Sequence, residues 1–128
     1  MAKVPSELGS AELEVLKALW DNGPGTVRQV LEHLHAKGRR VAYTTVLTVL
    51  TRLEQKGFVA SDKSDLAYVY RAKVTRERVA GTRAKAMIQQ LYDGAAAPLV
   101  LQLMQSGKFT AEEIEQLQRL IERLDANG

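Results

Sequence analysis

The sequence has 128 residues, of which 45% are hydrophobic and 26% are charged, and its formal net charge is +3. This length gives one domain, or one small domain with an appendage, and is enough to bury a core. No apolar run approaches the roughly 20 residues that a membrane-spanning helix needs, and the N-terminus lacks the layout of a secretory signal, so we expect a cytoplasmic protein. The chain has no cysteine and only two histidines, His33 and His35. Disulfides and thiolate metal sites are therefore excluded, and we expect no metal and no other cofactor.

The positive charge is concentrated in the middle of the chain. Residues 28–75 carry nine Lys and Arg against four acidic residues, whereas residues 1–27 carry two against four and residues 76–128 carry seven against seven. A local basic excess favours an acidic partner such as nucleic acid. An uneven scatter of solvated charges is the alternative.

Two helices are expected before residue 38. Ser10 is the candidate N-cap of the first, whose inner stripe would be Leu13, Leu16 and Trp20, and the sequence Asn22-Gly23-Pro24-Gly25 ends it. Thr26 opens the second helix through a capping box with Gln29, and Lys37-Gly38 stops it. The buried stripe of this second helix is predicted to be Val27, Val30, Leu31 and Leu34.

The third helix, residues 42–57, has one apolar face and one unusual polar face. Its buried stripe is predicted to be Val46, Val49, Leu50 and Leu53. The opposite face carries Thr44, Thr48, Thr51 and Gln55, flanked by Thr45 and Arg52. Threonine is a poor choice for a face that meets only water, because it loses rotamer freedom in a helix. Short hydroxyl side chains beside an arginine suit close approach to DNA, although a solvated face that happens to carry threonine is the alternative.

The pattern changes to a β-hairpin after Gly57. Residues 58–60 start an extended stretch, residues 61–65 have turn chemistry, and residues 66–71 resume with β-branched and aromatic side chains. Three short helices followed by such a hairpin form a winged helix-turn-helix. Lys63 at the wing tip and Arg71 at its base could reach the DNA backbone, or Lys63 could be a solvated turn residue.

Three further helices are expected after residue 75. Thr75 is the N-cap of residues 76–92, Pro98 suits the first turn of the next helix, and Thr110 forms a capping box with Glu113 in the last. So short a segment can hardly bury its apolar faces alone, which favours a symmetric dimer, the alternative being that the helices fold back on the winged helix. The candidate dimerisation residues are Leu99, Leu103, Ile114, Leu117, Ile121 and Leu124.

The predicted fold class is therefore mainly α with a small β-hairpin wing. We expect a winged-helix DNA-binding domain at residues 1–75 and a helical dimerisation domain at residues 76–128. Arg28, Arg39 and Arg40 could add contacts to the DNA backbone, although each could equally be a solvated arginine.

Several segments together resemble one known family. Residues 11–16 (AELEVL), Trp20, residues 26–30 (TVRQV), residues 42–57 (AYTTVLTVLTRLEQKG) and residues 68–71 (YVYR) are similar to the BlaI/MecI/CopY family of bacterial transcriptional repressors, the penicillinase repressor family. The resemblance implies a winged-helix domain that binds an inverted-repeat operator and a helical domain that forms a homodimer. The groove-facing positions that it implies are Tyr43, Thr44, Thr45, Thr48 and Arg52.

The resemblance is weaker in the part that concerns release from DNA. Antibiotic-responsive members are cleaved by a membrane sensor protease at an Asn-Phe peptide, and this chain has Gln102-Leu103 at the aligned position. Copper-responsive members carry Cys-x-Cys pairs, which this chain lacks. Metal sensing by that route is excluded, and cleavage at Gln102-Leu103 is a hypothesis with an altered site.

No motif in the sequence supports an enzyme. It contains no Gly-rich phosphate loop, no nucleophile elbow and no metal-ligand cluster, so we expect a DNA-binding protein without catalytic residues. The alternative function is a winged-helix adaptor that docks on another protein without sequence-specific DNA binding, because fold alone does not decide function.

Overall fold

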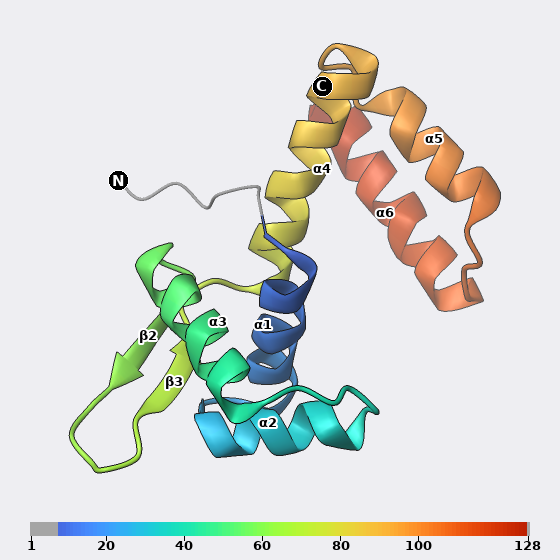
Figure 1. The fold of residues 1–128 in the computed structure, drawn as a ribbon. Coiled ribbons are helices and arrows are strands. Elements are labelled where there is room, and N and C mark those ends of the chain that lie inside the picture. Colours follow the sequence, from blue (N-terminus) through green and yellow to red (C-terminus); the bar gives the residue numbers. More distant parts are fainter. Residues whose placement is uncertain (1–7, 128) are drawn as a thin grey trace. The chain divides into compact units, whose positions relative to one another are not determined.

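The computed structural model describes residues 8–127, which form six helices and three short strands (Figure 1). The chain divides into two compact units between Met87 and Ile88, so the long fourth helix contributes to both. In chain order the elements are α1 (Ser10–Asn22), β1 (Gly25–Thr26), α2 (Val27–Ala36), α3 (Tyr43–Gln55), β2 (Val59–Asp62), β3 (Val69–Ala72), α4 (Arg76–Tyr92), α5 (Ala97–Ser106) and α6 (Ala111–Asn127).

The first unit is a winged helix built around one apolar core. Helices α1, α2 and α3 all pack against one another, and Leu16, Leu50, Leu53 and Phe58 are completely buried between them and the sheet. The predicted buried stripes of α2 and α3 are confirmed at every position. Burial of each such side chain is worth about 1.5–3 kcal/mol, so α3 is held firmly by its inner face.

The start and the buried face of α1 differ from the prediction. Gly9, not Ser10, is the N-cap, and its N–H donates to Oε1 of Glu12 at 2.9 Å. The predicted cap at Ser10 is wrong, because the Glu12 carboxylate accepts the N–H of Gly9 and the helix is capped one residue earlier. Leu13 and Trp20 are only partly buried, since the helix is rotated so that its buried residues are Glu12, Val15, Leu16, Ala18 and Leu19.

The end of α3 is fixed by local hydrogen bonds. Lys56 is the C-cap, and Gly57 follows it with φ +85°. The N–H of Gly57 donates to the Glu54 carbonyl and the N–H of Phe58 donates to the Leu53 carbonyl. This pair of bonds is a Schellman motif. The motif requires a left-handed backbone conformation at one residue, and glycine adopts that conformation without strain. The buried Phe58 and Leu53 side chains accompany the motif.

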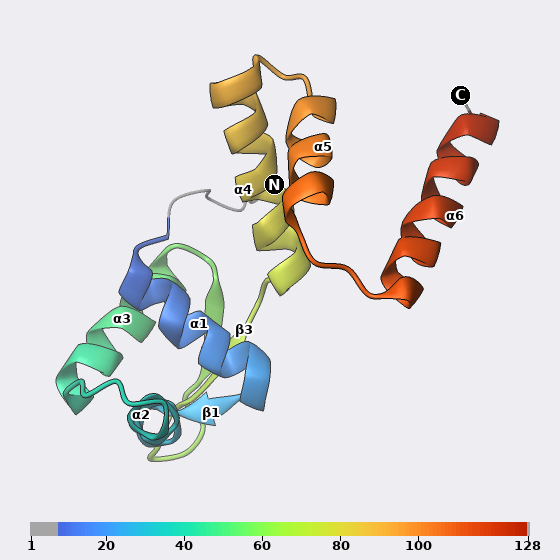
Figure 2. The same ribbon diagram turned by 90° about the vertical axis from the view of Figure 1, so that its right-hand side faces the viewer.

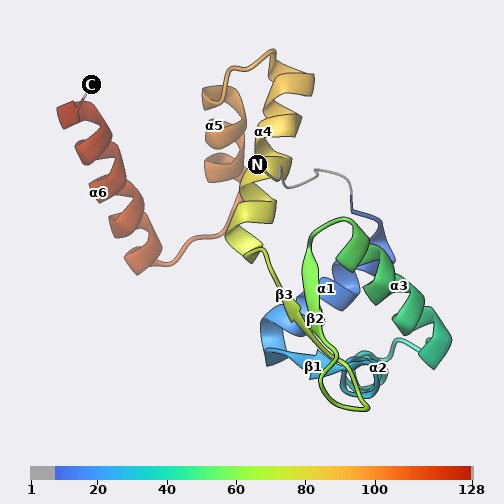
Figure 3. The same ribbon diagram turned by 90° about the vertical axis from the view of Figure 1, so that its left-hand side faces the viewer.

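The sheet has three antiparallel strands in the order β1-β3-β2. The two-residue strand β1, beside the start of α2 in Figure 2, was not predicted, and it pairs Gly25 with Tyr70. Figure 3 shows β2 and β3 side by side as the wing. The wing is confirmed, but its strands are shifted: Ser61 and Asp62 belong to β2, whereas residues 66–68, predicted as strand, lie in the connecting loop. Asp62 caps this loop by accepting a hydrogen bond from the Ser64 N–H at 2.9 Å.

The first part of α4 packs on the winged helix. Val79 is buried in its core, the indole N–H of Trp20 donates to the Val74 carbonyl at 2.9 Å, and Arg76 pairs with Asp21 at 2.7 Å. The predicted cap at Thr75 is confirmed by its hydrogen bond from the Arg78 N–H. The compact unit therefore continues past residue 75, the limit that we predicted for the DNA-binding domain.

The second unit contains the end of α4 with α5 and α6. The predicted capping box of α6 is confirmed, because Thr110 and Glu113 exchange hydrogen bonds of 2.9 and 3.1 Å, and Pro98 lies in the first turn of α5. Neither α5 nor α6 has a fully buried residue. None of the helices within residues 8–127 combines the length and the apolar character that crossing a bilayer requires.

Candidate nucleic-acid interface

The outer face of α3 is the centre of the candidate site. The residues predicted to face a groove are all exposed on it, together with Thr51: Tyr43, Thr44, Thr45, Thr48 and Arg52. Within residues 8–127, Arg52 forms no close ion pair, although its charge helps to lower the pKa of the nearby Glu12 carboxyl. An arginine beside short side chains can bind a base edge or a phosphate in a bidentate way.

Two of the threonines make hydrogen bonds to their own helix. The hydroxyl of Thr48 donates to the Thr44 carbonyl at 2.9 Å, and the hydroxyl of Thr51 donates to the Leu47 carbonyl at 2.8 Å. Such bonds to the residue four positions earlier are a known alternative for threonine in a helix. They determine which groups of these side chains remain free to meet a ligand.

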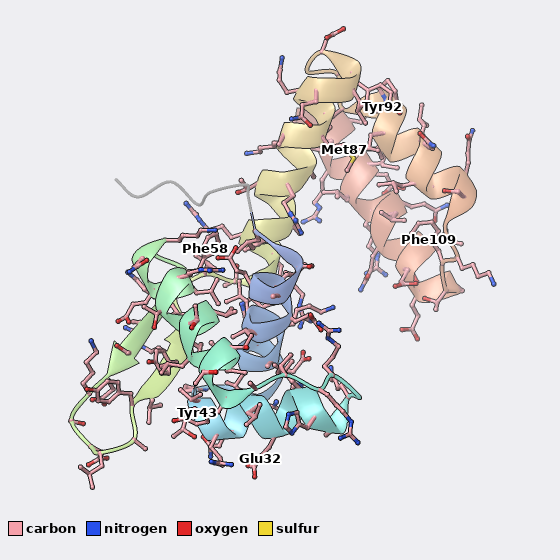
Figure 4. All side chains as sticks on the ribbon, in the orientation of Figure 1. Glu32, Tyr43, Phe58, Met87, Tyr92 and Phe109 are labelled. Atoms are coloured by element: carbon pink, nitrogen blue, oxygen red, sulfur yellow. The ribbon has the colours of Figure 1, made fainter. Side chains whose placement is uncertain are left out.

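A hollow of about 500 Å³ lies between the first turn of α3, the start of α2 and the wing loop. Its lining includes three tyrosines, Tyr43, Tyr68 and Tyr70. Arg28 lies over the Tyr43 ring, with its Cζ 5.5 Å from the ring centroid, and the Lys63 ammonium lies 5.6 Å from the centroid of Tyr68. The hollow therefore combines apolar and aromatic walls with two exposed cations. Figure 4 shows Tyr43 at the α2 end of α3, with Phe58 at the opposite end.

Tyr70, the buried tyrosine of this hollow, keeps its phenol proton. Burial raises the pKa of the Tyr70 phenol above its usual value, and the nearby Glu54 carboxylate acts in the same direction. Tyr70 is therefore neutral at physiological pH and forms part of the floor, whereas Tyr43 and Tyr68 are exposed at the sides.

The structure separates the other predicted cations from this hollow. Arg39 pairs with Glu14 on α1 at 2.7 Å, while Arg40, in the connection before α3, is exposed. Arg71 lies on β3 and lines a different hollow with Trp20 and Arg76. Of the basic residues predicted to contact the backbone, only Arg28 and Lys63 are placed beside the tyrosines.

Two features of the site were missed by the sequence analysis. Leu47 and Tyr68 line the hollow, and Glu12 forms a buried ion pair with Lys56 at the end of α3. Leu47 could have been noticed as an apolar residue four positions after Tyr43 on a polar face. No local signal indicates the ion pair, because its two partners are 44 residues apart.

The candidate dimerisation residues lie on an exposed apolar surface of the second unit. Leu99 and Leu117 are half-buried, whereas Leu103, Ile114, Ile121 and Leu124 are exposed. Gln102 and Leu103, the candidate cleavage site, lie inside α5, where the Gln102 amide oxygen accepts a hydrogen bond from Tyr92 at 3.0 Å. Within residues 8–127, no cluster of three or more His, Asp or Glu side chains gathers that could hold a metal ion.

The chain is similar to a family of known proteins and to several of its members. Residues 8–123 match the model of the family described as penicillinase repressor. The chain is 38% identical to the transcriptional regulator BlaI of Mycobacterium tuberculosis, covering 98% of this chain and 90% of that protein. It is 26% identical to the penicillinase repressor of Bacillus licheniformis, covering 95% and 94%, and 26% identical to the methicillin resistance regulatory protein MecI of Staphylococcus aureus, covering 91% and 94%.

One solved structure is similar to the winged-helix part of the fold. It is the solution structure of the DNA-binding domain of the repressor BlaI, with a TM-score of 0.52 and 29% sequence identity. The match covers 61% of this chain and 93% of that domain.

Proposed function

Because the chain belongs to the penicillinase repressor family, we propose that it is a transcriptional repressor that binds an operator in double-stranded DNA as a homodimer. The observation that carries the proposal is the outer face of α3, where Arg52, an exposed arginine, lies beside a row of exposed threonines. This helix is held by four buried residues, so it can enter a major groove without rearranging.

The hollow beside α3 supports a role in holding one DNA strand. A phosphodiester strand alternates apolar sugars with anionic phosphates, and the hollow offers aromatic walls together with Arg28 and Lys63. The N-terminus of α2 also faces it through Thr26, and helix N-termini favour phosphate. In the proposal, these residues position the protein on the backbone while the threonine and arginine face reads the bases.

The exposed side chains of α5 and α6 support dimerisation through the second unit, as predicted for residues 76–128. A monomer rarely exposes so many large apolar side chains, and a second copy would cover them. The exposed apolar residues of these two helices are Val100, Leu101, Leu103, Met104, Ile114, Leu120, Ile121 and Leu124. A two-fold dimer presents two α3 helices, so the operator in this proposal is an inverted repeat.

Release by proteolysis is the second step of the proposal. Cleavage between Gln102 and Leu103 by a membrane sensor protease would separate α6 from the rest of the chain. Because both residues lie within α5, the helix must open locally before a protease can bind them. Incubation with the cognate protease should give two fragments, and an intact chain on a gel would remove this step.

The test of the main proposal is selection from a pool of random DNA duplexes by the purified protein, at low and at near-physiological salt. We expect an inverted repeat to be enriched at both salt concentrations, because base contacts add to the salt-dependent phosphate contacts. Binding that disappears with salt whatever the sequence would overturn sequence-specific recognition and favour the adaptor alternative. The proposal places the protein in the cytoplasm, with the bacterial DNA.

A further inference from the structure

The hydroxyl hydrogens of two threonines on α3 are already used inside the helix. Thr48 donates to the Thr44 carbonyl and Thr51 donates to the Leu47 carbonyl. A threonine has one hydroxyl hydrogen, so in this arrangement neither side chain directs a donor outward. Because both residues are exposed, each can offer a ligand its γ-methyl group and an oxygen lone pair.

This leaves the threonine face with a defined chemical preference. In the major groove guanine presents two acceptors, thymine presents a methyl group, and adenine and cytosine present an amino donor. At Thr48 and Thr51 the surface offers methyl groups and acceptors but no donor, so these two positions complement a thymine methyl and are poor partners for guanine. Arg52, the residue after Thr51, supplies a guanidinium donor beside them.

The spacing of the two threonines fits consecutive base pairs. Residues three apart on a helix lie on the same side, about 4.5 Å apart along the axis. Neighbouring base pairs of B-DNA are roughly 3.4 Å apart. In the proposed complex the two methyl groups meet two neighbouring base pairs.

We propose that Thr48 and Thr51 determine the sequence specificity of the interface by contacting the 5-methyl groups of thymines, while Arg52 supplies the contact to guanine. The inference rests on the proposed function and adds to it which base group these residues recognise. It assigns recognition of thymine to an apolar contact and not to a hydrogen bond from a hydroxyl.

The first experiment leaves the protein unchanged and alters the DNA. After selection of the operator, each thymine of the half-site is replaced in turn by deoxyuridine, which lacks only the 5-methyl group, and the dissociation constant is measured. At one or two positions we expect binding about fourfold weaker per half-site, which corresponds to about 0.8 kcal/mol for one buried carbon at 1.4 kcal/mol per factor of ten.

The second experiment identifies the residue that makes the contact. Thr48→Ser keeps the hydroxyl and removes the methyl, whereas Thr48→Val keeps a methyl in the same position and removes the hydroxyl. We expect the serine variant to bind thymine and uracil operators equally, and the valine variant to retain the difference. The corresponding substitutions Thr51→Ser and Thr51→Val should change the thymine preference at the neighbouring base pair. Circular dichroism checks that the variants keep their helices.

The outcomes separate this inference from the proposed function. A selected operator in which no uracil replacement matters, or whose half-site contains no thymine, overturns the inference and leaves the repressor function standing. Loss of discrimination in the valine variants but not in the serine variants would show that the hydroxyl reads the base, which also overturns it. A pool from which no sequence is enriched overturns both.

Discussion

Glu12 and Lys56 form an ion pair that joins the first turn of α1 to the end of α3. The Lys56 ammonium lies 2.8 Å from Oε1 of Glu12, and the same oxygen accepts the N–H of Gly9. Glu12 is only 6% exposed, and its second oxygen, Oε2, is buried without a hydrogen-bond partner among the described residues. The end of the proposed recognition helix is thus anchored by a buried charge as well as by apolar packing.

This anchor should make stability depend on pH. Burial by itself raises the pKa of Glu12, but the Lys56 ammonium and the Gly9 N–H outweigh it, so that the pKa lies below the usual value of 4.5. A carboxyl whose pKa is lower in the folded than in the unfolded protein stabilises the fold above the unfolded pKa and loses this effect as pH falls through the folded pKa. We expect the free energy of unfolding to be constant near neutral pH and to fall below about pH 4.5, measured by urea unfolding with Trp20 fluorescence.

The variant Glu12→Gln should remove the part of this dependence that comes from Glu12 and should lower stability at pH 7, while Asp21 and Asp62, whose pKa values are also lowered, keep their own parts. A hydrogen bond to a charged group contributes about 1.5–3 kcal/mol, and we expect a loss in this range. The matched control is Glu14→Gln on the same helix as Glu12. It breaks the half-exposed ion pair between Glu14 and Arg39 and should cost less than about 1 kcal/mol. Equal losses in the two variants would contradict the role given to Glu12.

Replacing Arg52 by Ala should weaken operator binding without unfolding the protein. Because Arg52 is exposed and a good bidentate contact to a base contributes about 1–3 kcal/mol, we expect affinity to fall by roughly 5- to 150-fold per half-site. Affinity for unrelated DNA should change much less, and the protein should stay folded. Unchanged operator affinity would mean that α3 does not present this face to the bases.

Replacing Arg28 by Ala should weaken binding to all DNA sequences by a similar factor. If Arg28 contacts a phosphate from the hollow, its loss should reduce the slope of log affinity against log salt concentration by about 0.9 per half-site. Lys108→Ala, in the connection between α5 and α6, serves as the control and should leave this slope unchanged. If Arg28→Ala changed the preferred DNA sequence and left the salt dependence of binding unchanged, Arg28 would contact a base and not a phosphate.

Replacing Ile121 by Asp should prevent dimerisation. The side chain is exposed in one chain, so the fold of the monomer should survive, while a charge inside an apolar interface is costly. Analytical ultracentrifugation should show a dimer for the original protein and a monomer for the variant, with weaker binding to the full operator but not to one half-site. Glu122→Ala, at the neighbouring position, is the control, and a variant that stays dimeric would place the interface elsewhere.

The sequence by itself determined the features that depend on neighbouring residues. The capping boxes at Thr26 and Thr110 need only a partner three positions later, and the two faces of α3 follow from its helical period. The winged-helix fold and the exposure of the predicted groove-facing residues could be predicted for the same reason. Their contacts with DNA stay predictions.

Only the tertiary structure decided the features that join distant segments. The strand β1 has two residues and exists because it pairs with β3, and the hollow forms where Tyr43 and Tyr68 come together from α3 and the wing. Hydrophobic periodicity places a glutamate outside, yet Glu12 is buried because the fold brings Lys56 to it. Local patterns report the preferences of a segment for helix, strand or turn. The pairing of a charge or a strand edge with a distant partner depends on how the whole chain packs.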